Sequence, residues 1–346
     1  MSQLGSRAEA PGGSEGLMGQ VGWGIMATGG IASAFANDLK VDGLKLVAVG
    51  SRDATRARAF ADRHGALRAH GSYRALAEDP EVDVVYVATP HNLHLENALT
   101  AIEAGKHVLV EKALTINAQE AATLAAAAKR AGVVCMEAMW TRFLPHMVRL
   151  RELLDHGVIG QPVGLIADHT QRLPDHPAHR LNDLALGGGA LLDLGVYPIS
   201  FAYDLFGAPE QIEAVFGALR PTGADRQVSA VFSHGSGART WWVAASDMRG
   251  ANRACVLGTE GRVEIDPVWY TPTTMRAYGA DGRLLDSFDG ATPGRGMQHE
   301  AREMERLIED GAVASSVMPL WQSVEIMETM DQIRAQIGVV YAADAV

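Results

Sequence analysis

The sequence predicts an α/β protein in two parts: a doubly wound parallel sheet comes first, and an α+β region with a large, mostly antiparallel open sheet follows. In the first part, short apolar strands alternate with helical segments from residue 21 to about residue 143, a pattern typical of a parallel sheet between layers of helices. In the second part, two helical segments precede short strands separated by Gly, Asp and Pro, which predicts an antiparallel sheet. We therefore expect a disordered leader at 1–19, a nucleotide-binding domain at 20–143, and a substrate-binding and oligomerisation domain at 144–346.

The first part contains strands and helices in strict alternation. Several of its helical segments end at glycine or proline, which are common helix stop signals. The segment at 82–90 is a continuous apolar, β-branched run, as expected of a strand buried on both faces. Strands are predicted at 21–27, 44–51, 82–90, 106–112 and 133–139, and helices at 28–39, 52–65, 73–80, 92–105 and 117–132.

The second part begins and ends with helices. The last two are expected to be able to pack back on the first domain. Helices are predicted at 146–157, 189–207, 297–311 and 320–338, and strands at 212–219, 227–234, 239–246, 253–266, 274–279 and 283–288.

Adjacent tryptophans in one of these strands bear on oligomerisation. Trp241 and Trp242 are consecutive, and consecutive side chains of a strand point to opposite faces. One of these two large aromatic side chains must therefore face away from the core of its own domain, which indicates a subunit interface. We expect a homodimer or a homotetramer formed through the second sheet.

Composition excludes several classes of partner. Hydrophobic residues make up 47% of the 346 residues and the formal net charge is −11, which argues against nucleic acid or an anionic membrane as the main partner. No apolar run approaches the roughly 18 residues of a membrane span. The two cysteines, Cys135 and Cys255, lack metal-ligand spacing, so we expect no metal. The leader lacks the apolar segment of a secretory signal; we expect a cytoplasmic protein, with Met18 as an alternative start.

A glycine-containing loop after the first strand indicates a dinucleotide site. Ala27, Gly29 and Ala32 occupy the positions of the three small residues in a dinucleotide fingerprint, between a strand and a helix. Small residues, here with Gly30 and Ile31, allow the backbone to approach a pyrophosphate at the helix N-terminus. The alternative is a tight strand–helix turn that binds nothing.

The end of the second strand distinguishes the two nicotinamide cofactors. NAD sites typically carry an acidic residue there for the ribose hydroxyls, whereas this strand ends with Ser51 and Arg52. A serine hydroxyl and a guanidinium suit a phosphate group, so the sequence favours NADP. Asp53 stands one position later, where it can cap the following helix, and NAD remains an open alternative.

Three separated residues are candidates for proton transfer. Lys112 follows a predicted strand at its carboxyl end, where doubly wound sheets bind ligands. Asp193 and Tyr197 are four residues apart in a predicted helix and so share one face. Proton transfer by a tyrosine near neutral pH requires its pKa to fall from about 10, which a neighbouring lysine cation favours. The alternative is that Asp193 is a surface charge and Tyr197 a core aromatic.

Together these segments resemble the Gfo/Idh/MocA oxidoreductases over about residues 21–341. The matching stretches are GIMATGGIA, VATPHNLHLENALTAIEAGKHVLVEKALTIN, MEAMWTRFLP, GGGALLDLGVYPISF and MQHEAREMERLIEDG. EAMWTRFLP and the Asp-x-x-x-Tyr pair resemble the branch that contains dimeric dihydrodiol dehydrogenase and NADP-dependent xylose dehydrogenases. The resemblance implies a Rossmann domain and NAD(P)-dependent chemistry on sugars, polyols or cyclic diols.

The resemblance also implies roles for individual residues. It implies that Lys112, Asp193 and Tyr197 are the catalytic set and that Arg180 contacts a substrate or phosphate oxygen. It further implies cofactor contacts, with Thr89, Pro90 and His94 along the nicotinamide side, Glu111 at the nicotinamide ribose, and Trp140 and Arg142 near the cofactor. The alternatives are that His94 is an exposed residue at a helix start and that Trp140 only packs at the domain boundary.

One position departs from the family pattern. The family's Glu-Lys-Pro is Glu-Lys-Ala here, with Ala113 in place of proline. In the family this peptide often contains a cis bond, but a cis bond before a residue other than proline costs about 2.5–4 kcal/mol. We therefore expect a trans bond at Ala113 and a less firmly held Lys112.

These observations predict reversible hydride transfer between NADP and a carbinol carbon of a sugar, polyol or cyclic diol. Tyr197 exchanges the hydroxyl proton, Lys112 lowers the pKa of the phenol and bonds the substrate oxygen, and Asp193 orients the substrate or Lys112. An alternative within this mechanism gives the proton to Lys112 and leaves Tyr197 to bind substrate. Two alternative functions are a non-catalytic NAD(P)-binding sensor on the same fold and a reductase of keto or anhydro sugars.

Overall fold

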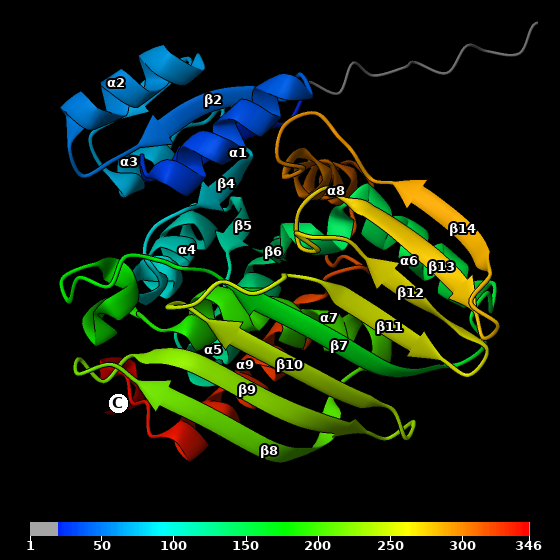
Figure 1. The fold of residues 1–346 in the computed structure, drawn as a ribbon. Helices are drawn as coiled ribbons and strands as arrows, with labels where there is room; N and C mark the ends of the chain where they lie inside the picture. Colours follow the sequence, from blue (N-terminus) through cyan, green and yellow to red (C-terminus); the bar gives the residue numbers. More distant parts are fainter. Residues whose placement is uncertain (1–19, 346) are drawn as a thin grey trace, which may run out of the picture.

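The computed structural model describes residues 20–345 (Figure 1). The predicted leader at 1–19 and the alternative start at Met18 lie outside the described residues. Two sheets form the scaffold of the described part, and the chain passes once from the first to the second between strands β6 and β7.

The first sheet is parallel and carries the nucleotide-binding topology. Its order, β3-β2-β1-β4-β5-β6, reverses direction between β1 and β4, which places ligands at the carboxyl ends of these strands. Strand β4 is buried along its whole length, as its continuous apolar sequence predicts. The strands are β1 Gly22–Met26, β2 Lys45–Gly50, β3 Arg68–His70, β4 Val84–Val87, β5 His107–Glu111 and β6 Cys135–Ala138.

Capping residues mark the ends of α2 and α5 in this half. The Asn117 side chain accepts a hydrogen bond from the Glu120 N–H at the start of α5, and Gly65 and Gly132 close α2 and α5 in the left-handed conformation. The helices are α1 Gly30–Val41, α2 Ala54–His64, α3 Tyr73–Ala77, α4 His94–Glu103 and α5 Ala118–Ala131.

The second sheet has eight strands in the order β14-β13-β12-β11-β7-β10-β9-β8. All neighbouring pairs are antiparallel except β7 and β10, which run parallel. The predicted class, a parallel sheet followed by a mostly antiparallel open sheet, is confirmed. The strands are β7 Pro162–Thr170, β8 Pro209–Leu219, β9 Asp225–His234, β10 Arg239–Ala245, β11 Ala254–Gly258, β12 Gly261–Ile265, β13 Thr274–Gly279 and β14 Leu284–Asp289.

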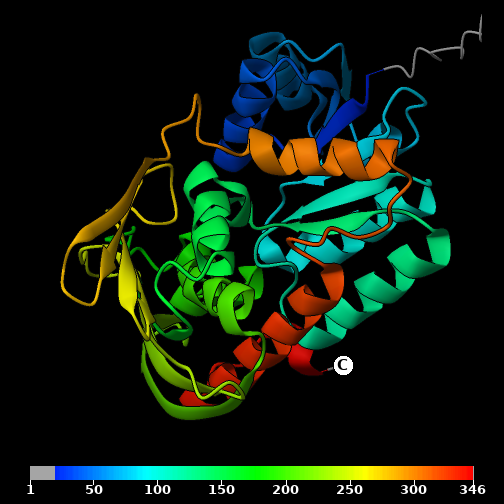
Figure 2. The same ribbon diagram turned by 90° about the vertical axis from the view of Figure 1, so that its right-hand side faces the viewer.

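Helices cover one face of the second sheet and leave its other face uncovered (Figure 2). Trp242 is buried under these helices, whereas Trp241 points to the open face and is 41% exposed. The two tryptophans therefore point to opposite faces, as predicted. The helices of this half are α6 Pro145–Asp155, α7 Val196–Phe206, α8 Gln298–Glu309 and α9 Leu320–Ile337.

The two C-terminal helices pack back on the first domain. Asp38 of α1 accepts hydrogen bonds from the N–H groups of Arg295 and Met297, just before α8. Asp331 of α9 accepts one from the Ala118 N–H at the start of α5. Figure 2 shows α9 alongside α5. The domain boundary at residue 143 stays a prediction.

One helical stretch, Leu184–Phe206, is long and apolar enough to cross a membrane by length and composition. Within its most apolar window, 83% of the residues are buried inside the protein. A buried core helix meets the same criterion, and this stretch includes α7, which packs beneath β7 and β10.

Candidate active site

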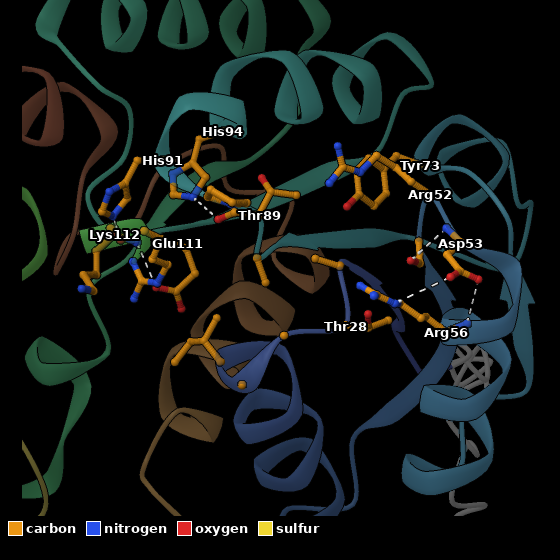
Figure 3. A pocket seen from close by; sticks show the side chains of 18 of the residues that line it. Thr28, Arg52, Asp53, Arg56, Tyr73, Thr89, His91, His94, Glu111 and Lys112 are labelled. Carbon is orange, nitrogen blue, oxygen red and sulfur yellow. Dashed lines mark hydrogen bonds and ion pairs between the residues drawn. The ribbon is translucent and has the colours of Figure 1, made fainter. Parts of the chain in front are cut away.

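A pocket of about 720 Å³ opens along the carboxyl ends of the parallel strands (Figure 3). The first domain supplies most of its wall, and Arg180 and Asp193 of the second domain close one end. From the first domain, the wall comprises residues 27–31 after β1, residues 51–53 and Arg56 after β2, Tyr73, residues 88–91 and His94 after β4, and Glu111 and Lys112 at the end of β5.

The loop after β1 offers an open helix N-terminus to this pocket. Gly29 is the N-cap of α1 and provides no side-chain cap, so the first N–H groups of the helix stay available to an anion. A Cβ placed on Gly29 or Gly30 would meet nothing within 4 Å. Ala27 adopts a φ of 91°, a left-handed conformation that is uncommon outside glycine. These features fit the pyrophosphate of a dinucleotide.

Two guanidinium groups gather at the end of β2. Arg52 lies beside Tyr73, and Arg56 extends from the first turn of α2 (Figure 3). Asp53 accepts hydrogen bonds from the Thr55 and Arg56 N–H groups and therefore caps α2, as expected. A carboxylate committed to a helix start is poorly placed to hold ribose hydroxyls, whereas the two cations suit a ribose phosphate. Sequence reasoning named Ser51 and Arg52 but missed Arg56 and Tyr73.

At the other end of the pocket, Lys112 and Asp193 form a largely buried ion pair. The Lys112 Nζ donates to the Asp193 backbone oxygen at 2.8 Å and lies 3.1 Å from its Oδ1. The two side chains are 13% and 12% exposed. Arg180, which is half exposed, lies 3.7 Å from the same Oδ1. The structure thus brings three predicted residues from two domains together.

The ion pair determines the charge state of both partners. Burial lowers the pKa of Lys112, but the opposing effects of Asp193, Tyr197 and Glu111 together exceed burial, and the net pKa is raised. Burial raises the pKa of Asp193, but Lys112, Arg180 and His91 together exceed that effect and hold the pKa well below its usual range. At neutral pH the lysine is a cation and the aspartate an anion.

Tyr197 lies behind this pair and does not line the pocket. The Lys112 Nζ lies 5.2 Å from the centre of the Tyr197 ring, and the Tyr197 hydroxyl accepts a hydrogen bond of 3.0 Å from Trp140 Nε1. Burial raises the pKa of Tyr197, and the opposing effect of Lys112 does not compensate. Lys112 thus lowers the pKa of the phenol, as predicted, but burial raises the pKa by more, and the net pKa of Tyr197 lies above its usual value.

Glu111 lies in the pocket wall, and its carboxylate is hydrogen-bonded to neighbouring residues. Its carboxylate accepts hydrogen bonds from the Tyr86 hydroxyl and, at 3.2 Å, from the Lys112 N–H. Burial raises the pKa of Glu111, with Lys112 opposing. Its predicted role at the nicotinamide ribose stays a prediction.

Two histidines hold the backbone around Lys112. The ring nitrogens of His94 lie 3.0 Å from the Ala113 carbonyl oxygen and 2.9 Å from that of Thr89. His94 is fully buried, so it is not the exposed helix-start residue of the alternative interpretation. His91, which sequence reasoning missed, lies 3.0 Å from the Gly187 carbonyl oxygen and 3.2 Å from that of Lys112. Burial lowers the pKa of His91 to about 3 and that of His94 to about 4.

The peptide bond between Lys112 and Ala113 is cis, so the expected trans bond is wrong. That expectation considered only the intrinsic preference of an isolated peptide bond. Ala113 is fully buried and its carbonyl contacts His94, so the tertiary surroundings act on this peptide as well.

Two predicted cofactor residues lie outside the pocket wall. Trp140 is buried and contacts Tyr197, while the Arg142 guanidinium bonds to Ser200 and to the Val317 carbonyl. Arg142 therefore links the helices of the second domain. Thr89 and Pro90 do line the pocket. Among residues 20–345, no group of three or more His, Cys, Asp or Glu side chains is arranged to hold a metal ion.

The glycine run before Asp193 permits close packing. A Cβ on Gly187 would lie 2.9 Å from the His91 side chain, and one on Gly188 would lie 2.8 Å from backbone atoms of Arg180 and Asp183. Gly189 has a φ of 146°, and a Cβ there would lie 2.2 Å from Asp225. The run therefore lets the turn before Asp193 pack closely against these neighbours.

Curated relatives cover almost the whole chain. Trans-1,2-dihydrobenzene-1,2-diol dehydrogenase from Bos taurus is 35% identical over 333 residues, covering 93% of this chain and 98% of its own. The counterpart from Danio rerio is 38% identical with the same coverage. D-xylose 1-dehydrogenase (NADP+) from Hypocrea jecorina is 35% identical and covers 92% of both chains.

Solved structures share the fold over a similar span. KijD10, a 3-ketoreductase from Actinomadura kijaniata in complex with NADP and TDP-benzene, superposes with a TM-score of 0.81 at 27% identity, covering 92% of this chain and 98% of its own. Aldose-aldose oxidoreductase from Caulobacter crescentus gives a TM-score of 0.83 at 25% identity, with the same coverage.

Two family descriptions match consecutive parts of the chain. Residues 21–139 match the oxidoreductase family with an NAD-binding Rossmann fold, and residues 147–264 match the C-terminal domain of the same family. The resemblance drawn from the motifs, the two-domain fold and the class of NAD(P)-dependent oxidoreductase are thereby confirmed. The chain belongs to the Gfo/Idh/MocA oxidoreductase family.

Proposed function

We propose that this protein is an NADP-dependent dehydrogenase/reductase that interconverts a CH–OH group and a carbonyl in a sugar, polyol or cyclic diol. The observation that carries the proposal is the buried Lys112–Asp193 pair at the end of β5, beside Tyr197 and at one end of a dinucleotide-sized pocket. Relatives at 34–38% identity act on dihydrodiols and on xylose, which supports this substrate class.

NADP is the proposed cofactor, with NAD as the alternative. The pyrophosphate fits the open N-terminus of α1 at Gly29 and Gly30, and a ribose phosphate fits Ser51, Arg52 and Arg56. Bound NADP supplies the hydride acceptor, and NADPH the hydride donor. Thr89, Pro90, His94 and Glu111 are proposed to hold the nicotinamide half.

The chain's own residues handle the proton and the substrate oxygen. Lys112 Nζ, held by Asp193, is a cation that stabilises negative charge developing on the substrate oxygen. In reduction, Tyr197 donates its phenolic proton to the substrate oxygen; in oxidation, its phenolate accepts the hydroxyl proton. The raised pKa in the free protein keeps the phenol protonated, which suits donation in reduction, so oxidation requires the phenol first to release this proton to solvent. Asp193 and Arg180 are positioned to orient neighbouring substrate hydroxyls.

The alternative assignment gives the proton to Lys112 and leaves Tyr197 to bind substrate. We expect Lys112→Met and Tyr197→Phe each to lower kcat by roughly 10²–10⁴-fold, which is the usual range for general acid–base groups. Lys129→Met, an exposed lysine on α5, is the matched control. Full turnover in both site variants would overturn the assignment, and loss in Lys112→Met alone would favour the alternative.

The test of activity is a substrate panel. Aldopentoses, aldohexoses and dihydrodiols are offered with NADP and with NAD, while the near-ultraviolet absorbance of reduced nicotinamide is recorded. We expect turnover of at least one class with NADP. NADPH binding without turnover of any substrate, in either direction, would instead favour a non-catalytic sensor; turnover confined to keto sugars with NADPH would identify a reductase.

We also propose that the protein is a cytoplasmic homodimer or homotetramer associated through the open face of the second sheet. Ile166, Phe216 and Trp241 are large, exposed apolar side chains of strands β7, β8 and β10 in this sheet, and such exposure is typical of interfaces. Sedimentation of the wild type and of Trp241→Glu tests this: the charged variant should dissociate to monomers.

A further inference from the structure

The chain after α9 turns back toward the candidate active site. Val339 and Tyr341 are buried, whereas Val340 between them is 66% exposed. The side chains of Val339 and Tyr341 therefore face the protein, and Tyr341 reaches the turn that precedes Asp193.

An arginine of α9 secures this tail. The Arg334 guanidinium, whose side chain is 5% exposed, bonds to both carboxylate oxygens of Asp344 at 2.7 and 3.1 Å. The same guanidinium lies 4.7 Å from the centre of the Tyr341 ring. A bidentate arginine–carboxylate pair is geometrically specific, and here the arginine is buried while Asp344 is partly exposed, so the pair fixes the path of the tail over residues 341–344.

From this anchor the tail contacts both halves of the site. Asn117, which follows the Lys112 segment and caps α5, donates from Nδ2 to Asp344 Oδ1 at 3.0 Å. On the other side, the Tyr341 hydroxyl donates to the Gly188 carbonyl oxygen at 3.0 Å. One tail thus joins the first-domain loop that carries Lys112 to the second-domain turn that precedes Asp193.

The same turn is held by a buried carboxylate of β9. Asp225 Oδ2 accepts a hydrogen bond of 2.6 Å from the Leu191 N–H, two residues before Asp193. A Cβ on Gly189 would lie 2.2 Å from Asp225 Oδ1 and 3.2 Å from the Tyr341 hydroxyl oxygen. Tyr341 and Asp225 therefore converge on one turn, which has no room for a larger residue.

We propose that Arg334, Tyr341 and Asp344 form a C-terminal clamp whose members are positioning residues for the reaction. The clamp holds the start of the helix bearing Asp193 and Tyr197 in register with the loop bearing Lys112. The inference deepens the proposed function and rests on it, since the clamp is expected to affect turnover through the Lys112–Asp193 pair.

The physical reason lies in the geometry of that pair. Lys112 and Asp193 come from different domains and meet at 3.1 Å, so a small relative shift of the two domains separates them. Misplacement by about 1 Å can cost a large part of a rate enhancement that depends on orientation. The clamp crosses the same domain junction through Asn117 and Gly188 and opposes such a shift.

The experiment compares two buried tyrosines that each lose a hydroxyl. Tyr341→Phe removes the bond to the Gly188 carbonyl. Tyr203→Phe removes a hydroxyl of α7 that donates to the Glu325 carbonyl of α9 at 2.9 Å and lies 2.8 Å from Thr329 Oγ1. Tyr203→Phe should therefore lose at least as much stability as Tyr341→Phe, while Tyr341→Phe alone should lower kcat, by about tenfold, with the Kd for NADPH unchanged.

A pH profile supplies a second, independent readout. The pKa of Lys112 is raised by Asp193, so a loosened pair should move the alkaline limb of the kcat–pH profile toward lower pH in Tyr341→Phe and not in Tyr203→Phe. Asp344→Asn, which keeps the side-chain shape but weakens the bond to Arg334, should shift the limb in the same direction. Val340→Ala, at an exposed position of the same tail, should have no effect.

The clamp is overturned if Tyr341→Phe and Tyr203→Phe lower kcat equally, or if neither Tyr341→Phe nor Asp344→Asn shifts the alkaline limb. Failure of the proposed function has a different signature: the wild type would show no turnover, or Lys112→Met would be as active as the wild type.

Discussion

The two ends of the pocket differ in how far their charged side chains are exposed to solvent. At the end of β2, the Arg56 and Asp53 side chains are 77% and 53% exposed. At the end of β5, Lys112 and Asp193 are 13% and 12% exposed. Exposed charges are screened by water and salt and contribute modest, separable energies, whereas buried charges interact strongly. The first end is therefore suited to selecting a cofactor, and the second to chemistry that depends on coupled protonation states.

Removing the buried anion should produce a larger effect than any change at the exposed end of the pocket. Asp193→Asn keeps an oxygen for Lys112 but removes the charge that raises the pKa of Lys112. We expect kcat to fall by roughly 10²-fold and the alkaline limb of the kcat–pH profile to move to lower pH, because a lysine with a lower pKa loses its proton earlier. Steady-state kinetics across pH measures both.

Asp204→Asn is the matched control for this change. Asp204 lies on α7, its side chain is 9% exposed, and it pairs with Arg151 at 2.9 Å. If the alkaline limb of the kcat–pH profile shifted in both variants, the shift would arise from a general disturbance of the helix and not from loss of the Lys112–Asp193 ion pair.

Changes at the exposed end should be smaller and should separate the two cofactors. Arg52→Ala and Arg56→Ala should each raise the KM for NADP by about tenfold, since an exposed charge-assisted hydrogen bond is worth about 1–2 kcal/mol, with kcat and the KM for NAD nearly unchanged. Arg63→Ala, an exposed arginine farther along α2, serves as the control. Equal losses with NADP and NAD would contradict a phosphate-specific role.

Behind the catalytic end, a change at the buried Glu137 carboxyl should act on stability and leave turnover nearly unchanged. Burial raises the pKa of Glu137 from its usual value near 4.5 to about 7. Between these pH values the unfolded chain releases a proton that the folded protein keeps, so this group makes the free energy of unfolding fall as pH rises through that window.

Glu137→Gln does not titrate and can still accept the hydrogen bond from the Leu114 N–H. Relative to wild type, it should therefore gain stability from about pH 4.5 to 7, by at most about 3 kcal/mol. Urea unfolding at several pH values measures the difference. Glu78→Gln, at an exposed position, should leave the pH dependence of the free energy of unfolding unchanged. If the curves for Glu137→Gln and wild type ran parallel, the raised pKa of Glu137 would not contribute to this pH dependence.

Most of the fold could be predicted because its long elements carry strong periodic and capping signals. Two strands were missed. Strand β3 has only three residues, all half-buried at the sheet edge, and so offers no apolar pattern. Strand β7 carries two exposed apolar residues, Val163 and Ile166, and these obscure the alternation by which a half-buried strand is identified.

Site residues that lie a fixed number of positions after a strand could be predicted from the sequence. Site residues that are brought together only by tertiary packing could not. Lys112 follows β5 directly, and its meeting with Asp193 followed from recognised motifs. Arg56 lies one helical turn beyond the fingerprint position, and His91 is brought to Gly187 only by the folded chain. The raised pKa of Tyr197 depends on burial, which no local pattern reveals.

The hydrogen bond from Trp140 to the Tyr197 hydroxyl has a stereochemical consequence. The indole N–H occupies one lone pair of the phenol oxygen, so the hydroxyl hydrogen must point elsewhere, and the rotation of this group is restricted. Lys112 Nζ is fixed in turn by Asp193. Both polar atoms would contact the same substrate oxygen, so a half turn about the C=O axis would keep these contacts and present the opposite face of the carbonyl to the cofactor. Binding of a neighbouring hydroxyl by Asp193 and Arg180, which lie 3.7 Å apart, would exclude that turn. The alcohol formed by reduction should then have a single configuration at the new carbinol centre.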